Sequence, residues 1–530
     1  MGKNNMADLS QTEDAKEKDM RNISIKEIRL KNYRVFLDEK IVCNADYNIF
    51  VGDNGSGKSS IIHGIDLVLS GNVSKVTSIG LKSLFNSRAV SEWKKSPAIE
   101  TLPVLTIELF LNMPDEPKWH RFNGEHYLNS NGKSTYGIKM ECKPNPDFIK
   151  DIEEIVEGKN TIEIFPFEFY TVEFSTFADQ TYTGYLKPFR YLFVDNTVIN
   201  SAKALRFIVE NTFQNVVDER NLLSSRLNFR QHTEKFTLPA EAIKRDLKVI
   251  GDLDSCLEIE KDGIALAGRG DGYISMCKTE SALLKHIEKS SVVAIEEPEN
   301  HLSHSCLRTL IANIKEKAEY RQLFIVTHNS YITSRIGLRN VYFVNKRVCS
   351  MSKISSETAN FFMKAPNDNI LQFVLSKKIL LVEGAAEFIL MEKFIKAITG
   401  EDAATLGIWT IALNNLSFSR YLELGSVLGS KVAVVRDNDK KSQKWYESFC
   451  GDKIQVFVDE DVARYTFEVC LYNDNQEKIG KIFSDEPDAL KYMLDHKAEA
   501  AFRILESKEE VVPPSYISKA IKWLSGMQGK

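Results

Sequence analysis

Long apolar segments are absent from this chain of 530 residues. No hydrophobic run reaches the length of a membrane span, and the first 22 residues are polar and charged, without the apolar core of a secretion signal. We therefore expect a cytoplasmic protein with no membrane partner, in which residues 1–22 form a flexible tail.

Cysteine motifs and an excess of positive charge are also missing. The eight cysteines are scattered, with no CxxC pair and no cluster of His and Cys, which favours a reducing compartment and argues against a zinc site. The formal net charge is −4, so the chain as a whole is not basic, although local basic patches can still bind nucleic acid. With 43% hydrophobic and 27% charged residues the composition is that of a globular protein, and the length allows two to four domains.

A glycine-rich loop is the first motif that carries chemistry. Residues 48–51 have the pattern of an apolar strand, residues 52–59 read GDNGSGKS, and an amphipathic helix pattern starts at Ser59. This is G-x-x-x-x-G-K-[ST] between a strand and a helix, which curls backbone N–H groups around phosphate oxygens. Lys58 is expected to reach the β- and γ-phosphates of ATP, and Ser59 to place its hydroxyl on Mg²⁺. The residues expected to bind the nucleotide here are Gly52, Asn54, Gly55, Gly57, Lys58, Ser59 and Ser60.

A second nucleotide element lies about 240 residues downstream. An apolar strand pattern ends in Glu296 and Glu297, which are expected to support Mg²⁺ and to align the attacking water as a general base. A further apolar run ends at Thr327 and His328, where a histidine can sense the γ-phosphate. A histidine of the hydrophobic core is the alternative for His328.

Glycines also precede a helix pattern in ALAGRGDGYISM (265–276). Gly268, Gly270 and Gly272 can offer backbone N–H groups to a phosphate, or can simply form a flexible turn. Together, the three elements resemble the ATP-binding-cassette head of the structural-maintenance and recombination-repair ATPases, and by that resemblance Ala267–Gly272 is a divergent signature loop. That resemblance implies that two heads dimerise and that the loop of one covers the nucleotide of the other. The segment departs from the family because LAGRGDG lacks the usual serine.

Four carboxylates mark the last third of the chain. Glu383 and Glu387 follow one short apolar run, and Asp437 and Asp439 follow another. Both runs are typical of buried parallel strands, and open α/β sheets carry their ligand sites at the carboxyl ends of such strands. We expect the first pair to share one face of a helix and the second pair one side of an extended segment. Four carboxylates held together favour Mg²⁺ or Mn²⁺, whereas two ordinary acidic clusters on a solvated rim are the alternative.

These C-terminal motifs resemble the toprim domain of topoisomerases, primases and some nucleases. Further strand patterns at 407–415 and 453–458 predict a Rossmann-like parallel sheet, without the GxGxxG of dinucleotide binding. The resemblance makes Glu383 the toprim glutamate and Asp437 with Asp439 the DxD pair.

An ATPase head followed directly by toprim resembles the OLD (overcoming lysogenization defect) family of endonucleases, including Gabija-type and retron-associated relatives, over about residues 23–530. By that resemblance Thr466 and Glu468 of TFE (466–468) join the metal site, and Lys497 is a catalytic lysine. A solvated helix lysine is the alternative for Lys497. Phe467 replaces the family's leucine, and EEPENHLSH (296–304) departs from the usual ending of the acidic strand motif.

The expected fold is α/β: an ABC/SMC-type P-loop ATPase head followed by a Rossmann-like toprim domain. The ATPase domain is expected over 23–370, with an antiparallel sheet built from alternating runs such as 102–112 and 160–175 and a helical dimerisation insertion at about 201–250. The toprim nuclease domain is expected over 371–530.

The predicted function is ATP-binding and hydrolysing, metal-dependent cleavage of DNA, gated by nucleotide state or a partner, in anti-phage defence. The expected partners are DNA, a second copy bound through the ATPase domains, and either a retron reverse transcriptase with its RNA–DNA product or another defence protein. A recombination-type ATPase that binds nucleic acid without cutting it is the main alternative. A strand-passing or priming enzyme is a further alternative, but strand passage needs a tyrosine nucleophile on a separate module, for which the chain has no room.

Overall fold

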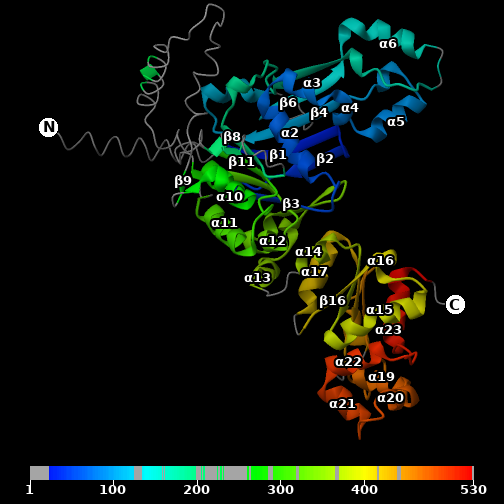
Figure 1. The fold of residues 1–530 in the computed structure, drawn as a ribbon. Coiled ribbons are helices and arrows are strands. Elements are labelled where there is room, and N and C mark those ends of the chain that lie inside the picture. The colour runs from blue at the N-terminus through cyan, green and yellow to red at the C-terminus, as the bar shows by residue number, and fades with distance from the viewer. Residues whose placement is uncertain are drawn as a thin grey trace, which may run out of the picture. The chain divides into compact units, whose positions relative to one another are not determined.

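The computed structural model describes residues 23–124, 134–157, 161–197, 260–261, 264–284, 291–317, 321–364, 369–414, 417–438 and 443–527, with isolated residues at 159 and between 204 and 231. The chain forms two compact units (Figure 1). The N-terminal unit comprises residues up to 332 together with 340–348, and the C-terminal unit comprises 333–339 together with 349 onward. Across these described ranges, none of the helices combines the length and the apolar character that crossing a bilayer requires.

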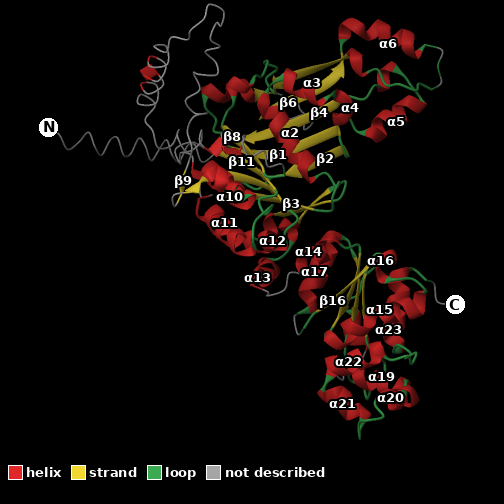
Figure 2. Cartoon of the chain, viewed as in Figure 1, coloured by secondary structure: helices red, strands yellow, loops and turns green. Residues whose placement is uncertain are grey.

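The first sheet of the N-terminal unit is antiparallel (Figure 2), with strand order β2-β1-β4-β6-β5 and with β7 paired to β6. Its strands are β1 (Ser24–Tyr33), β2 (Phe36–Val42), β4 (Leu105–Asn112), β5 (Asn123–Gly124), β6 (Thr135–Pro144) and β7 (Tyr170–Thr176). The predicted strand over 160–175 is wrong in its first half, because a strand begins only at Tyr170. Pro166 lies just before it, and the rings of Phe165 and Phe167 pack on each other at 4.6 Å instead of alternating along a strand.

The second sheet of this unit has the order β14-β13-β3-β12-β11-β8, and neighbouring strands from β13 to β8 run parallel. Its strands are β14 (Val348–Ser350), β13 (Val341–Val344), β3 (Tyr47–Val51), β12 (Arg321–Val326), β11 (Ser291–Glu296) and β8 (Arg190–Asp195). The three strands predicted to carry the nucleotide motifs, β3, β12 and β11, are adjacent. Their carboxyl ends, which carry those motifs, therefore lie side by side.

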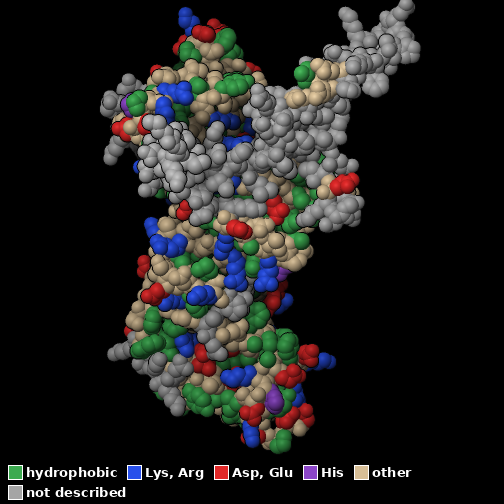
Figure 3. Space-filling view, turned by 90° about the vertical axis from the view of Figure 1, so that its left-hand side faces the viewer, with side chains coloured by type: hydrophobic (Ala, Val, Ile, Leu, Met, Phe, Trp, Pro, Cys, Tyr) green, Lys and Arg blue, Asp and Glu red, His purple; other side chains and the backbone are tan. Residues whose placement is uncertain are grey.

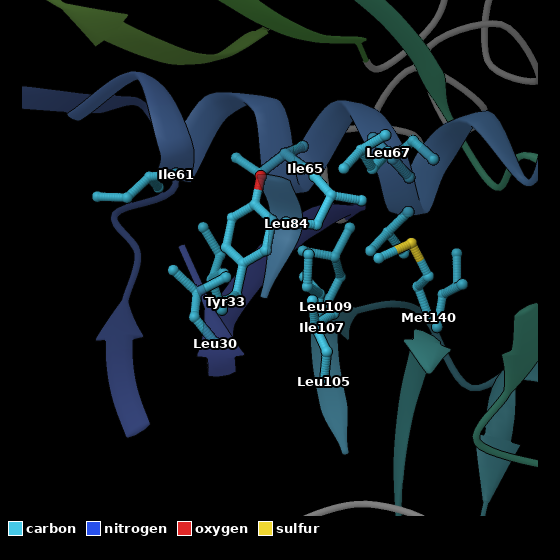
Figure 4. Packing of buried hydrophobic residues seen from close by; sticks show 14 of the residues in the cluster. Leu30, Tyr33, Ile61, Ile65, Leu67, Leu84, Leu105, Ile107, Leu109 and Met140 are labelled. Carbon is cyan, nitrogen blue, oxygen red and sulfur yellow. The ribbon is translucent and has the colours of Figure 1, made fainter. Parts of the chain in front are cut away.

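Helix α2 (Lys58–Ser70) packs its apolar side on the antiparallel sheet (Figure 4). Ile61, Ile65 and Leu67 of α2 lie in one buried cluster with Ile107 of β4 and Met140 of β6. The helix also contacts β11 and β12 of the parallel sheet, so the phosphate-loop helix is held between the two sheets.

A buried glutamine also joins the two sheets. The Gln322 amide on β12 accepts the Ile25 N–H at 2.8 Å and donates to the Ile25 carbonyl at 2.8 Å and to the Asn44 carbonyl at 2.8 Å. Buried amides are rarely left without partners. Here the side chain makes the pair of hydrogen bonds to Ile25 that a neighbouring strand would make.

The remaining described elements of the N-terminal unit surround these sheets. They are α3 (Val73–Ile79), α4 (Leu81–Leu84), α5 (Ser87–Lys95), α6 (Ile149–Val156), β9 (Glu260–Lys261), β10 (Ile264–Ala265), α10 (Asp271–Leu284) and α11 (His304–Lys317), and α12 (Ser330–Ile336) continues into the C-terminal unit. The predicted helical insertion at 201–250 lies almost wholly outside the described residues.

The C-terminal unit is built on a four-stranded parallel sheet of order β16-β15-β17-β18. Its strands are β15 (Lys378–Val382), β16 (Ile408–Ala412), β17 (Lys431–Val435) and β18 (Ile454–Phe457). The chain leaves β15 for β16 on one side and then returns to β17 on the other. The strand order therefore reverses between β15 and β17, and ligands of open α/β sheets bind at the carboxyl ends of such a pair.

Helices cover both faces of this sheet. Alternate residues of β15 and β17 (Leu380, Val382, Ala433 and Val435) lie in one core cluster with α15 (Ala385–Thr399), α22 (Lys497–Glu506) and α23 (Ser515–Ser525). Contacts on the other face come from α14 (Asn369–Leu375) and α17 (Phe418–Leu428). The remaining helices are α13 (Ser356–Lys364), α16 (Ala403–Leu406), α18 (Gln443–Glu447), α19 (Phe467–Asp474), α20 (Gln476–Ile482) and α21 (Ala489–Asp495).

Helix α13 packs within the C-terminal unit, where the Phe362 ring lies 4.9 Å from that of Tyr421 on α17. The C-terminal unit therefore includes residues that lie before position 371, the predicted start of the toprim domain.

Candidate functional site

The phosphate loop has a backbone that only glycine adopts readily at two of its positions. Gly55 and Gly57 have φ of 75° and 111°. A Cβ on Gly57 would lie 2.5 Å from the Val35 side chain, and one on Gly52 would lie 2.2 Å from the Val344 carbonyl. The loop thus closes tightly onto its surroundings, directly before the N-terminus of α2, as phosphate binding requires.

Lys58 occupies the first position of α2 and is buried. Its Nζ donates to the carbonyls of Gly52 at 2.7 Å and Asp53 at 2.8 Å. Burial lowers the pKa of this ammonium group, and the nearby Glu297 and Asp53 carboxylates oppose that shift. Among the other predicted residues, Ser59 and Ser60 lie in the first turn of α2, and Asn54 is exposed on the loop. The glycine backbone, the lysine and the helix N-terminus together fit a nucleoside triphosphate.

The acidic pair lies at the end of β11, which is separated from β3 by β12. Glu297 has a φ of 46°, a conformation that costs free energy in a residue other than glycine and often marks functional sites. Its N–H donates to the Val326 carbonyl at 2.9 Å, and its carboxylate accepts from the Asn300 amide at 2.6 Å. The preceding Glu296 is buried, and its Oε2 lies 3.2 Å from Nε2 of His63 on α2.

Glu299 is a further carboxylate that was not among the predicted site residues, and it connects this strand end to His328. Glu299 is buried, and its Oε1 accepts the Thr327 hydroxyl at 2.6 Å and the His328 N–H at 2.9 Å. Nδ1 of His328 lies 3.3 Å from Glu299 and 3.9 Å from Glu297. Burial raises the pKa of Glu299, and the two hydrogen bonds oppose that shift. The structure therefore brings the His328 ring next to both Glu297 and Glu299, and the sequence signal of Glu299 is its place in EEPEN.

The glycine segment predicted to face a phosphate lies directly before α10. Gly268 and Gly270 are exposed, and a Cβ on Gly270 would meet no atom within 4 Å. In the described part of the chain, no hydrogen bond joins either glycine to residues 52–60. Their predicted contact with the nucleotide of a second copy stays a prediction.

The C-terminal unit brings Glu383 and Asp437 together at the point where its strand order reverses. Glu383 directly follows β15, and Asp437 lies two residues beyond β17. The Asp437 N–H donates to Oε2 of Glu383 at 3.1 Å, and Nε of Arg436 lies 3.5 Å from the same oxygen. The carboxylate of Asp437 is also held in place, because its Oδ1 accepts the Phe467 N–H at 2.8 Å.

Glu387 lies in the first turn of α15, is buried, and accepts the Gly384 N–H at 3.1 Å. Glu383 precedes this helix, so the expectation that both glutamates share one helix face is wrong. Burial raises the pKa of Glu387 to about 7, with a contribution from the negative charges of Glu468 and Glu383. Burial likewise raises the pKa of Asp437 to about 8, with Glu383, Glu387 and Glu468 adding to the effect. The carboxylates are thus close enough to oppose one another's ionisation.

Lys497 faces the same carboxylates from the first position of α22. Its Nζ lies 3.1 Å from Oε2 of Glu468, which is buried in the first turn of α19. Burial opposes the charge of Lys497, but Glu468, Asp437 and Glu387 outweigh it and raise the pKa of the lysine. Thr466, expected at the metal site, is the N-cap of α19 and accepts the Val469 N–H at 3.4 Å.

Asn438, the middle residue of the DxD motif, holds the neighbouring loop in place. Its buried Nδ2 lies within hydrogen-bonding distance of the carbonyls of Asp459, Asp461 and Arg464, at 3.3, 2.9 and 3.3 Å. The motif therefore anchors the loop that leads to Phe467 and Glu468. Asp439, the second aspartate of the predicted pair, lies outside the described residues.

The donor set of this site consists of carboxylate oxygens, which suits a hard divalent cation. Mutual repulsion of these carboxylates, which adds to burial in raising the pKa of Asp437, is relieved when a cation binds among them. Within the described residues no three His, Cys, Asp or Glu side chains already converge closely enough to hold a metal ion. The chemistry of the donors thus fits a divalent metal, whereas the geometry that a bound ion would impose is not yet formed.

Two family descriptions match the chain, and each falls on one of these centres. An AAA domain matches residues 27–248, and "Overcoming lysogenization defect protein-like, TOPRIM domain" matches residues 374–439. The chain therefore carries an AAA-type ATPase domain followed by an OLD-like TOPRIM domain. Its two domains therefore use a nucleotide and a divalent metal. The AAA match contains the phosphate loop, and the TOPRIM match contains Glu383, Glu387, Asp437 and Asp439.

Among curated proteins, this chain is similar to endonuclease GajA of Bacillus cereus (strain VD045). The two are 22% identical over 446 residues, which cover 79% of this chain and 75% of that protein. Among solved structures, it is similar to the SMC head domain from Thermotoga maritima, at 15% identity and a TM-score of 0.30, covering 61% of this chain and 96% of that one. It is also similar to the recombination mediator protein RecF with ATP, at 12% identity and a TM-score of 0.32, covering 62% of this chain and 99% of that one.

Proposed function

We propose that this protein is an OLD-family ATPase and metal-dependent endonuclease that cuts DNA at its toprim centre under the control of nucleotide bound to its ATPase domain. The observation that carries the proposal is the pairing of Glu383 with Asp437 at the reversal of strand order, opposite the Lys497–Glu468 ion pair. Acidic and basic groups converge there from β15, β17, α19 and α22. A binding surface for nucleic acid alone does not need buried carboxylates that repel one another.

The chemistry of the proposed centre follows from its charges. Divalent ions, Mg²⁺ or Mn²⁺, supply Lewis-acid stabilisation of the attacking and leaving oxygens in phosphodiester hydrolysis. The residues proposed to hold them are Glu383, Glu387, Asp437, Asp439 and Glu468. Lys497 supplies a positive charge that offsets the negative charge developing on the phosphate. The N–H of Phe467 and the side chain of Arg436 hold Asp437 and Glu383 in position.

The proposed nucleotide centre works through the residues at the ends of β3, β11 and β12. Lys58 exchanges its contacts with the Gly52 and Asp53 carbonyls for the phosphates of ATP. Glu297 orients the attacking water, and His328 reads the γ-phosphate. Glu299 holds the end of β12 in place because it accepts hydrogen bonds from the Thr327 hydroxyl and the His328 N–H.

The proposed partners are DNA and a second copy of the chain bound through the ATPase domains. The overall charge of −4 does not oppose DNA binding, because Lys and Arg side chains form local groups on the face shown in Figure 3. We place the activity in anti-phage defence, in the cytoplasm. A retron reverse transcriptase as partner has no support from the proteins that this chain resembles and stays a prediction.

Supercoiled plasmid tests the nuclease. The wild-type protein with Mg²⁺ or Mn²⁺ should nick or linearise it and leave 5′-phosphate and 3′-hydroxyl ends, and Asp437→Ala should lose this activity while still binding ATP. Asp452→Ala, at an exposed aspartate of the same unit, is the matched control and should cut normally. A wild-type protein that only shifts the plasmid would establish the DNA-binding alternative. Cutting by Asp437→Ala would disprove the assignment of the centre.

A further inference from the structure

A chain of three side chains runs into the acidic end of β11. Nη1 of Arg34 lies 3.1 Å from Nδ1 of His63, and Nε2 of His63 lies 3.2 Å from Oε2 of Glu296. The three residues come from the turn between β1 and β2, from α2 and from β11, so the contacts join both sheets and the phosphate-loop helix. The Phe193 ring of β8 stands edge-on to the imidazole, with the ring centres 5.6 Å apart.

The contacts determine which form of the imidazole is present. A guanidinium group has donors only, so Nδ1 of His63 must accept the hydrogen bond from Arg34. A neutral imidazole that accepts at Nδ1 carries its proton on Nε2. His63 therefore donates its Nε2–H to Oε2 of Glu296. Arg34 fixes the tautomer of the His63 imidazole, and the hydrogen bond from Nε2 of His63 fixes the orientation of the Glu296 carboxylate.

The position of His63 on α2 connects this arrangement to the nucleotide. His63 follows Ser59 by four residues, so the two side chains lie on the same side of the helix, one turn apart. Ser59 is proposed to place its hydroxyl on Mg²⁺, and Glu296 is proposed to support the same ion. His63 thus lies one helical turn after Ser59 and contacts Glu296.

We propose that His63 is a positioning residue for Glu296, and that Arg34 orients His63 by holding its Nδ1 as an acceptor. The inference rests on the proposed ATPase function and adds to it the residues that keep Glu296 aimed at the magnesium of bound ATP. Groups that orient a metal-supporting residue in this way typically change metal affinity 10–100-fold when they are removed. The phosphate loop itself is not altered, so binding of ATP without magnesium does not depend on His63.

Two substitutions of the histidine separate positioning from packing. In His63→Gln, the amide can still donate to Glu296 and accept from Arg34, whereas His63→Leu keeps the bulk and removes both contacts. Arg34→Met removes the donor that fixes the tautomer. His120→Leu serves as the control, because His120 is an exposed histidine of the same unit that contacts only an exposed carboxylate, Asp115, among the described side chains.

Binding of a fluorescent ATP analogue, titrated with Mg²⁺ and repeated in EDTA, is the decisive measurement. For His63→Leu we expect the half-saturating Mg²⁺ concentration to rise at least ~10-fold and kcat of ATP hydrolysis to fall, with binding in EDTA unchanged. His63→Gln should stay within ~3-fold of the wild type, Arg34→Met should fall between the two histidine variants, and His120→Leu should match the wild type.

The outcomes distinguish this inference from the proposed function. Absence of nucleotide binding and hydrolysis in the wild type would refute the ATPase, and the inference with it. An active wild type with an unchanged Mg²⁺ response in His63→Leu would refute the inference alone, and so would equal impairment of His63→Gln and His63→Leu. If His63→Leu does not fold, Arg34→Met and His63→Gln test the inference in its place. A wild-type Mg²⁺ response in Arg34→Met would show that Arg34 does not act by fixing the tautomer of His63.

Discussion

Replacing Glu387 by Gln should stabilise the C-terminal unit when no divalent ion is bound. The side chain is 6% exposed, and burial, with the charges of Glu468 and Glu383, raises its pKa from 4.5 to about 7. A carboxyl whose pKa is higher in the folded than in the unfolded protein destabilises the fold as the pH rises. The cost is absent below about pH 4.5 and complete above about pH 7. At ~1.36 kcal/mol per pH unit, the difference between these two values corresponds to ~3 kcal/mol.

Calorimetric unfolding in EDTA measures this effect. For a unit of this size ~3 kcal/mol corresponds to a Tm increase on the order of 5–10 °C, which is an upper limit because the surroundings of the charged carboxylate relax. The gain of Glu387→Gln should appear at pH 8 and largely vanish at pH 5. Glu392→Gln, at an exposed position of the same helix, is the matched control and should leave Tm nearly unchanged. Adding millimolar Mg²⁺ should then stabilise the wild type more than the variant.

Two results would refute the reasoning. A variant no more stable than the wild type at pH 8 in EDTA would show that the carboxylate carries no such cost. An equal gain at pH 5 and pH 8 would show that the amide stabilises the fold by packing or hydrogen bonding and not by removing a charge.

Three further predictions concern other parts of the chain. Gly57→Ala should abolish nucleotide binding in equilibrium titrations, because its φ of 111° and the crowding of an added Cβ force the phosphate loop to move. Asn438→Ala should destabilise the C-terminal unit by about 2–3 kcal/mol and lower plasmid cutting at least ~10-fold with nucleotide binding retained, since three backbone carbonyls lose the buried amide that they share as a donor. Glu27→Gln should destabilise the N-terminal unit by about 1–2 kcal/mol at pH 7, because buried Glu27 pairs with Arg29 and Lys40 at 2.8 and 2.9 Å, although both cations retain access to solvent. Burial raises the pKa of Glu27, but these two partners outweigh it and hold that pKa below its usual range, so the deficit in unfolding experiments should shrink as the pH falls below about 4.5.

The parts of the fold that could be predicted are those whose signals are local. The phosphate loop could be read because its strand, glycines and helix follow one another within about 20 residues. The four strands of the toprim sheet could be read because buried parallel strands are continuous apolar runs, and Glu383 and Asp437 stand one and two residues after the ends of two of them. The run 160–175 has the alternation of a strand, but packing between its aromatic rings decides where the strand begins.

Contacts between distant segments carry no such signal. His63 and Glu296 are 233 positions apart, and nothing in either neighbourhood announces their contact. Asn438 was overlooked because its role depends on three backbone carbonyls, which every residue possesses. Thr466 resembles a metal-site residue by motif, yet a threonine before a helix is also an ordinary cap, and the hydrogen bond to the Val469 N–H supports the second role.

Gln322 has a mechanical consequence for the head. It ties the amino end of β12 to β1, while the carboxyl end of β12 leads to Thr327 and His328. Slippage between the two sheets would break hydrogen bonds buried in the interior, which is costly. A displacement that starts at the γ-phosphate and pulls on β12 therefore has to carry the antiparallel sheet with it. The two sheets therefore move as one rigid body, which extends from the nucleotide loops to the outer surface of the antiparallel sheet.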